Sequence, residues 1–185
     1  SSNSWGEEEA LVFQRILEKG RFTMGESVNK FEASFADKIG IQNAIMVSSG
    51  SMANLVGLAA LFYKKNDPLK RGDEVIVPAL SMSASATAII MAGASPVFID
   101  IEEGSRGSFN LDVTLLEEKL SKKTKAILVV HLFGIPANMN RIISFAKENN
   151  LLVIEDCAQS PGTSSAQGYT GTLGDVGIFS FNQSK

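Results

Sequence analysis

Short apolar runs alternate with segments of helical periodicity along almost the whole chain, and this pattern constrains the fold more than any other feature. Near-continuous apolar strands separated by helices are typical of a parallel sheet covered on both faces. We therefore predict a three-layer α/β/α fold with a mostly parallel sheet. Strands are predicted at 44–47, 74–77, 96–101, 126–132, 151–154 and 176–181, and helices at 7–17, 27–39, 52–63, 83–91, 112–120 and 139–149. Loops are predicted at 66–72, 104–108, 134–138 and 160–174.

The composition is that of a soluble protein with a substantial core. The chain has 185 residues, of which 44% are hydrophobic and 20% charged, so one soluble domain is expected. A net charge of -3 gives no basic footprint for nucleic acid. The single cysteine, Cys157, excludes an intrachain disulfide framework and fits a reducing compartment. No apolar run approaches the ~20 residues of a membrane span, and no signal segment precedes the first helix, so we expect a cytoplasmic protein without a membrane partner.

Polar side chains gather where the predicted strands end. In open parallel sheets, ligands bind beyond the carboxyl ends of the strands, so these residues are expected at one edge. They are Ser48, Ser49 and Gly50, the segment 78–81, His131, Asp156 and Ser180.

Two of the strand ends carry groups suited to pyridoxal phosphate (PLP) chemistry. Asp156 follows one apolar run, and Lys185 follows another. A lysine amine can form the Schiff base with the cofactor, while a carboxylate keeps the ring nitrogen protonated. The alternatives are ordinary: Asp156 as a cap or ion-pair partner, and Lys185 as a solvated lysine at a chain end.

The remaining candidates allow both a functional and a structural interpretation. Ser49, Gly50 and Ser51 form either a phosphate-binding turn at a helix N-terminus or an ordinary serine-capped turn. His131, the only histidine, has no cysteine or acidic residue at metal-ligand spacing, so no metal site is expected and a place in the wall of the site is favoured over a catalytic base. Cys157 is interpreted as a packing residue. The chain has neither a dinucleotide fingerprint nor a Walker loop.

Taken together, the ordered segments from Gly20 to Lys185 resemble the DegT/StrS family of PLP-dependent sugar-nucleotide aminotransferases, which are fold-type I PLP enzymes. The densest match lies at 154–159 and then from Gly174 to Lys185. The other matching segments are 22–25, 28–36, 47–51, 72–78 and 94–100.

The resemblance implies a role for each matching residue around the cofactor ring. Lys185 would be the Schiff-base lysine and the proton shuttle, and Asp156 would pair with the pyridinium nitrogen. Gln159 would hydrogen-bond the ring hydroxyl, and Ala158 would pack beneath the ring.

A second group of residues would hold the rest of the cofactor. Ser180, with Gly50 and Ser51, would bind the phosphate. Met82 stands where the family usually places an aromatic residue that stacks on the ring. A thioether can pack on a ring face for about 0.3–1.5 kcal/mol, so this departure is compatible with cofactor binding.

The function implied by the resemblance is transfer of an amino group from an amino acid, with glutamate as the expected donor, to a keto-sugar nucleotide. A homodimer is also implied. One alternative is the sister branch of PLP-dependent sugar-nucleotide 3-dehydratases, which segments 22–25 and 78–81 partly resemble. That branch has histidine in place of the lysine, so Lys185 argues against it. A non-catalytic PLP- or sugar-binding regulator and an unrelated α/β nucleotide-binding domain are further alternatives.

The resemblance also bears on domain organisation. Family members continue past their lysine with a strand that inserts into the sheet and with a smaller C-terminal domain. Residues 1–185 are therefore expected to be the PLP-binding large domain of a longer polypeptide, with its small domain absent.

Overall fold

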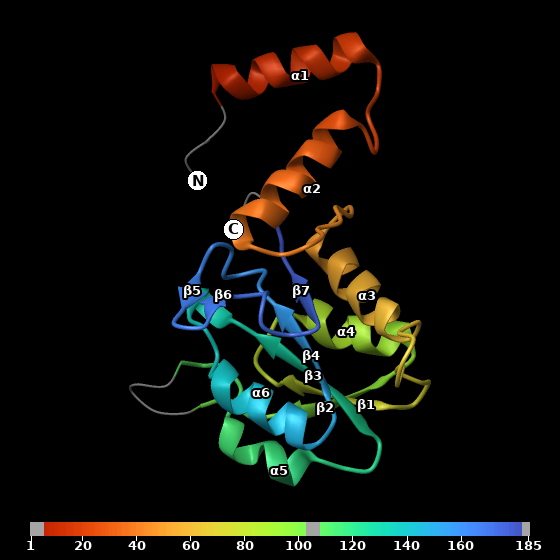
Figure 1. Ribbon diagram of the computed structural model, residues 1–185, viewed down its shortest axis with the longest axis vertical. Helices are drawn as coiled ribbons and strands as arrows, with labels where there is room; N and C mark the ends of the chain where they lie inside the picture. Colours follow the sequence, from red (N-terminus) through yellow and green to blue (C-terminus); the bar gives the residue numbers. More distant parts are fainter. Residues whose placement is uncertain (1–5, 103–107, 183–185) are drawn as a thin grey trace. The chain divides into compact units, whose positions relative to one another are not determined.

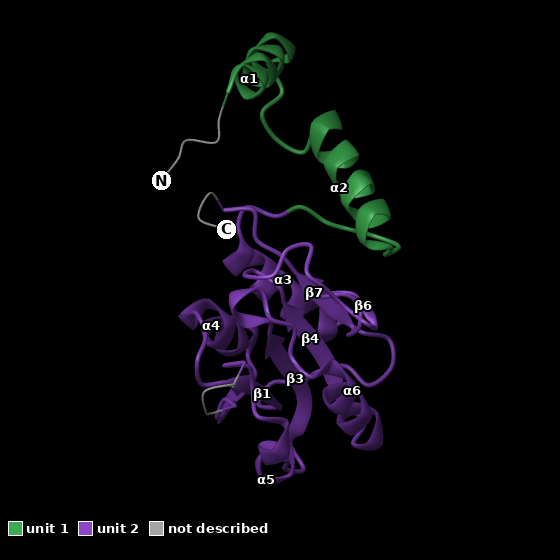
Figure 2. Cartoon of the chain, turned by 90° about the vertical axis from the view of Figure 1, so that its left-hand side faces the viewer, with its two compact units in different colours: residues 1–46 green, residues 47–185 purple. Residues whose placement is uncertain are grey.

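The computed structural model describes residues 6–102 and 108–182 (Figure 1). Where one domain is expected from composition, the structure divides the chain into two compact units, residues 1–46 and 47–185 (Figure 2). The catalytic candidates all belong to the second unit. The predicted loop at 104–108 lies outside the described residues except for Ser108, and so does Lys185.

The first unit consists of two helices, α1 (Glu7–Lys19) and α2 (Glu26–Ile39), as the apolar periodicity predicts. Every residue of α1 remains at least partly exposed, and α2 buries only Ala36 and Ile39. Phe31 and Phe35, on the predicted apolar face of α2, stack with their ring centroids 5.9 Å apart. Because its helices bury only two residues, the first unit has no hydrophobic core comparable to the one around the sheet.

The second unit is built on a five-stranded sheet in the order β2-β1-β3-β4-β7, with every neighbouring pair parallel. This confirms the predicted fold class. The strands are β1 (Glu74–Pro78), β2 (Ser95–Ile99), β3 (Thr124–Val130), β4 (Leu152–Asp156) and β7 (Val176–Ile178). β4 is buried along its whole length and β3 at every residue except Lys125, which explains why the runs 126–130 and 152–154 are apolar without alternation.

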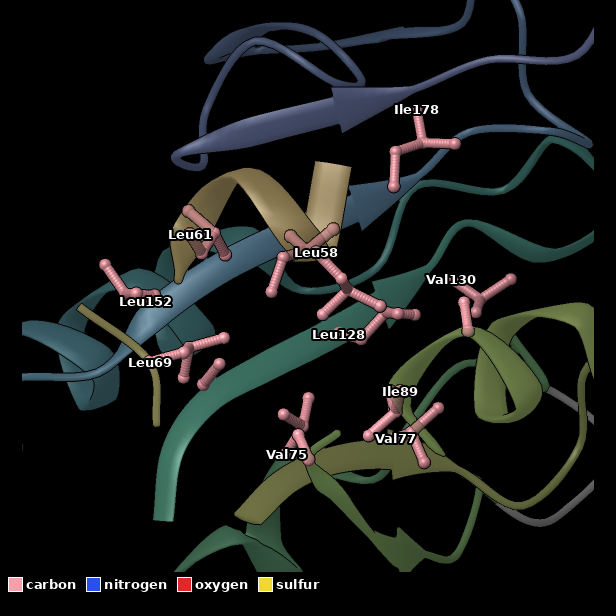
Figure 3. Close-up of a cluster of buried hydrophobic side chains, with 14 of the residues drawn as sticks. Leu58, Leu61, Leu69, Val75, Val77, Ile89, Leu128, Val130, Leu152 and Ile178 are labelled. Carbon is pink, nitrogen blue, oxygen red and sulfur yellow. The ribbon is translucent and has the colours of Figure 1, made fainter. Parts of the chain in front are cut away.

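Helices cover both faces of the sheet (Figure 1). One face packs against α3 (Gly50–Leu61) and α4 (Ser83–Ala92), whose Leu58 and Ile89 lie in one buried cluster with Leu128 of β3 (Figure 3). The opposite face packs against α5 (Leu116–Lys119) and α6 (Met139–Glu148), whose buried side chains form a second cluster with alternate residues of the same strands. A short 3-10 turn, η1 (Val113–Leu115), leads into α5.

Several element boundaries differ from the sequence-based predictions. The predicted buried strand at 44–47 is wrong: the segment is irregular, and Ile45 is 77% exposed. A strand needs a hydrogen-bonded neighbour, and no described strand pairs with this segment. The last strand ends at Ile178 rather than at residue 181, and the predicted loop at 160–174 contains a small hairpin, β5 (Ser164–Ser165) with β6 (Gly168–Tyr169). A second 3-10 turn, η2 (Leu132–Gly134), follows β3.

Candidate active site at the carboxyl edge of the sheet

Asp156 ends β4 and is the centre of a buried hydrogen-bond network. It is only 4% exposed. Its Oδ2 accepts hydrogen bonds from Asn54 Nδ2 of α3 and from Ser85 Oγ of α4, both at 2.9 Å. Its Oδ1 accepts one from the N–H of Ala158 at 3.0 Å. Burying a charge is costly unless hydrogen bonds compensate it, and these three donors do so.

The network extends outward through Ser85. Ser81 Oγ lies 3.0 Å from Ser85 Oγ. Because the hydroxyl proton of Ser85 is donated to Asp156, Ser85 can only accept from Ser81. The two helices on this face of the sheet therefore both hold the same carboxylate oxygen.

Gly50 and Ser180 come close together from opposite ends of the sequence. A Cβ atom on Gly50 would lie 2.9 Å from Ser180 Cβ and 3.1 Å from its Oγ, so only glycine fits here without a shift. Ser49 caps α3 by accepting a hydrogen bond from the N–H of Met52 at 3.2 Å. Within the described residues, the N–H groups of Gly50 and Ser51 are then the free donors of the first turn, beside the Ser180 hydroxyl. This arrangement suits an anionic group such as a phosphate.

Gln159, Ala158 and Met82, three further predicted site residues, lie at the same edge. Gln159 accepts a hydrogen bond from the N–H of Phe133 at 3.1 Å, which leaves its amide nitrogen as the group that can donate. Ala158 follows Asp156 directly and is partly buried. Met82 precedes α4 and is 67% exposed. Lys185 is assigned from the sequence alone, since it lies beyond the last described residue.

His131 is not in the wall of the site, contrary to the sequence-based preference. It is fully buried, with its Nε2 3.0 Å from Glu155 Oε2, and its Nδ1 accepts a hydrogen bond from the N–H of Ala137 at 3.0 Å. The Nδ1 atom therefore carries no proton, and Nε2 donates to Glu155. Its role is to join β3, β4 and the turn before α6.

Glu155 is also fully buried and receives four donors. Besides His131, the N–H groups of Gly171, Leu173 and Gly174 donate to it at 2.7–2.9 Å. Burial raises the pKa of this carboxyl, but the four hydrogen bonds outweigh burial and leave the pKa below its ordinary value. Glu155 thus anchors the loop that leads into β7.

Cys157 lies within 4.8 Å of ligand atoms of His131 and Glu155, a grouping of residue types that can bind metals. Here both imidazole nitrogens and both Glu155 oxygens already have protein partners. Burial, reinforced by the nearby charges of Glu155 and Asp156, raises the pKa of the thiol far above its usual range. The group is a structural cluster, and Cys157 is a packing residue.

Two polar residues of this site escaped the sequence analysis, Asn54 and Ser85. Asn54 had a usable signal: it is the only polar side chain in the run from Met52 to Leu61, one turn after Ser51. Asparagine is a poor helix former, so its place inside an apolar helix needs a reason. Ser85 had no such signal, because it is one of several serines around the start of α4.

The residues of this edge fit PLP. The turn at Gly50, Ser51 and Ser180 can hold a phosphate, and Asp156 is a buried carboxylate that can still accept one more hydrogen bond. Asn54 connects the two places, since its Nδ2 lies 2.9 Å from Asp156 Oδ2 and 3.5 Å from the carbonyl oxygen of Gly50. A parallel α/β sheet with these two features at its carboxyl edge is the arrangement of a PLP-binding domain.

Comparison with known proteins agrees with this class. The chain belongs to the DegT/DnrJ/EryC1/StrS aminotransferase family, whose model matches residues 3–185. It is 40% identical over 180 residues to GDP-4-keto-6-deoxy-D-mannose 3-dehydratase of Yersinia pseudotuberculosis, covering 97% of this chain and 45% of that protein. It is 39% identical over 159 residues to GDP-perosamine synthase of Caulobacter vibrioides, covering 86% of this chain and 40% of that protein.

Solved structures share the fold. An E. coli GDP-4-keto-6-deoxy-D-mannose-3-dehydratase with bound hydrated PLP superposes with a TM-score of 0.86 and 38% identity, covering 94% of this chain and 44% of that chain. The chain spans about half the length of the relatives it matches.

Proposed function

We propose that this chain forms the PLP-binding large domain, residues 1–185, of an aminotransferase that acts on a keto-sugar nucleotide. Glutamate is the proposed amino donor. The observation that carries the proposal is the buried carboxylate of Asp156, held by three donors at the carboxyl end of β4 beside the turn at Gly50 and Ser180. A carboxylate in this place can pair with a cationic ring nitrogen.

Bound PLP supplies an electron-withdrawing ring that stabilises negative charge at the carbon next to the transferred nitrogen. The chain's own residues orient this ring. Asp156 would keep the ring nitrogen protonated, and Gln159 would donate from its amide nitrogen to the ring hydroxyl. Ser180, Gly50 and Ser51 would bind the phosphate, while Ala158 and Met82 would pack on the ring faces.

Lys185 is the proposed acid–base residue. Its Nζ would hold the cofactor aldehyde between turnovers. As a free amine, Nζ would take a proton from the donor Cα and return it later, so Nζ must be unprotonated for part of the cycle. Desolvation beside the cofactor favours that neutral form.

The partners are proposed by analogy with the relatives, which are named for GDP-linked and dTDP-linked sugars. The substrates would be a keto-sugar nucleotide and an amino acid, and the active protein would be a cytoplasmic homodimer. In the described part of the chain, no helix is long and apolar enough to cross a membrane.

Sugar-nucleotide 3-dehydration is the second candidate, because a 3-dehydratase is among the similar relatives. The residue that separates the two is Lys185, where the dehydratase branch is expected to have histidine. A lysine can hold the cofactor covalently between turnovers, and a histidine cannot. We therefore favour amino transfer.

The deciding experiment gives the full-length protein PLP, glutamate labelled with heavy nitrogen, and a panel of keto-sugar nucleotides. Amino transfer places the label on the sugar, as detected by mass spectrometry. A deoxygenated sugar without the label would support the dehydratase and overturn the proposal. Borohydride reduction followed by peptide mapping should attach the cofactor to Lys185 in the wild-type protein and not in Lys185→Ala.

The same preparation tests the remaining alternatives. A non-catalytic regulator would bind PLP but show no spectral change on adding glutamate. An unrelated nucleotide-binding domain would show no cofactor absorbance. Thr124→Val, at the amino end of β3 and far along the strand from the site, is the matched control and should behave like the wild type.

A further inference from the structure

The carboxylate of Asp156 has one acceptor position left. An ionised carboxylate offers about four lone-pair positions, two on each oxygen. Asn54 and Ser85 occupy both positions of Oδ2, and the N–H of Ala158 occupies one on Oδ1. The protein itself therefore determines which oxygen is free to accept another hydrogen bond.

The orientation of the Asn54 amide follows from the same contact. A carboxylate can only accept, so the Asn54 atom 2.9 Å from Asp156 Oδ2 must be the nitrogen. This leaves Asn54 Oδ1 buried, and it has no hydrogen-bond partner among the described residues. Asn54 as a whole is only 2% exposed.

An unpartnered buried carbonyl oxygen destabilises the folded chain. A leucine at this position would extend the apolar helix without that cost, since the neighbours Ala53 and Leu55 pack against the core. Packing alone therefore does not explain the asparagine. Its one strong contact is with Asp156 Oδ2.

We propose that Asn54 and Ser85 are positioning residues for the pyridine nitrogen of the cofactor. By filling both acceptor positions of Asp156 Oδ2, they orient the carboxylate and reserve the open position on Oδ1 for the ring N–H. Ser81 supports Ser85 through the hydroxyl pair at 3.0 Å. This inference rests on the proposed PLP function and adds two residues, from α3 and α4, to the site.

The test measures cofactor binding without the covalent bond to Lys185. The probe is pyridoxamine 5′-phosphate, which has no aldehyde, and the full-length protein is titrated with it. The comparison ligand is its 1-deaza analogue, in which a C–H group replaces the ring nitrogen. If a residue acts through Asp156 on the ring nitrogen, replacing it weakens binding of pyridoxamine phosphate and leaves binding of the deaza analogue unchanged.

Asn54→Leu and Ser85→Ala are each expected to raise the Kd of pyridoxamine phosphate about tenfold, while changing the Kd of the deaza analogue less than about twofold. Ser85→Thr keeps a hydroxyl and should restore part of the affinity. The control is Thr124→Val, which removes a partly buried hydrogen bond from the Ser121 N–H at the other end of β3. It should leave both Kd values unchanged.

The inference would be overturned if Asn54→Leu and Ser85→Ala weakened binding of the two ligands equally. It would also be overturned if both variants bound pyridoxamine phosphate as tightly as the wild type. If Asn54→Leu does not fold, the Ser85→Ala and Ser85→Thr pair decides alone. Failure of the wild-type protein to bind either ligand would instead overturn the proposed function. The two failures are therefore distinguishable.

Discussion

Glu155 and Asp156 are consecutive residues of β4, yet their carboxylates face opposite sides of the sheet. Asp156 contacts Asn54 and Ser85 on the side of α3 and α4, while Glu155 contacts His131 and the loop at 171–174. The strand period of two residues makes this division unavoidable. One acidic pair thus supplies both the carboxylate proposed to bind the cofactor and an anchor for the loop before β7.

Replacing Glu155 with glutamine should destabilise the protein by about 3 kcal/mol. The amide would lose the negative charge and point an N–H group at backbone N–H donors that now have a carboxylate oxygen. The free energy of unfolding, from urea titration, checks this. Glu148→Gln, on the exposed end of α6, is the matched control and should change the free energy of unfolding by less than about 0.5 kcal/mol. A loss for Glu155→Gln no larger than that of the control would contradict the anchoring role.

Stability should fall in acid because of the same residue. The folded-state pKa of Glu155 lies below its ordinary value of 4.5, because four hydrogen bonds favour the charged form, so the unfolded chain binds the proton more readily. The contribution of Glu155 to the free energy of unfolding is fully present above pH 4.5 and is lost as the pH falls through the folded-state pKa. Urea midpoints measured from neutral pH down into this window should decrease for the wild type. The Glu155→Gln variant should lack this part of the decrease, and identical profiles for the two proteins would disprove the assignment.

Cys157 should resist alkylation in the folded protein. Its thiol is fully buried, and burial beside two carboxylates raises its pKa, so the reactive thiolate is scarce. At mildly alkaline pH, iodoacetamide labelling followed by mass spectrometry should be at least about a hundredfold slower than for the same cysteine in urea. Rapid labelling of the native protein would show that this cluster opens or that the thiol is activated.

The sequence pattern was sufficient to predict the parallel sheet, because β1, β3 and β4 each contain a segment buried on both faces, and these segments are short apolar runs without alternation. It failed at 44–47, where an equally apolar run is irregular and Ile45 is exposed. Apolar composition identifies a segment that can be buried, but strand formation also needs a hydrogen-bonded neighbour. Nothing local to the run encodes that neighbour.

The candidate site was predictable only in part. Asp156, Ser180 and the turn at Gly50 could be found because each follows an apolar run at the carboxyl edge. The donors to Asp156 could not, since Asn54 and Ser85 come from helices that are 102 and 71 residues away along the chain. His131 was misplaced for a related reason: its partner Glu155 is identifiable only once β3 and β4 are paired.

Gly50→Ala should separate cofactor binding from helix stability. Alanine is the better helix former by about 1 kcal/mol, so helix propensity alone would stabilise the variant. The added Cβ, however, would approach Ser180 Cβ to 2.9 Å and push α3 away from the segment that follows β7. We expect a lower thermal midpoint and a Kd for PLP raised at least about tenfold, as measured by calorimetry and fluorescence titration. Adding Ser180→Gly removes the clashing Cβ and should restore the midpoint, but not the affinity, because the hydroxyl proposed to hold the phosphate is lost. Recovery of both in the double variant would mean that Ser180 only packs against α3.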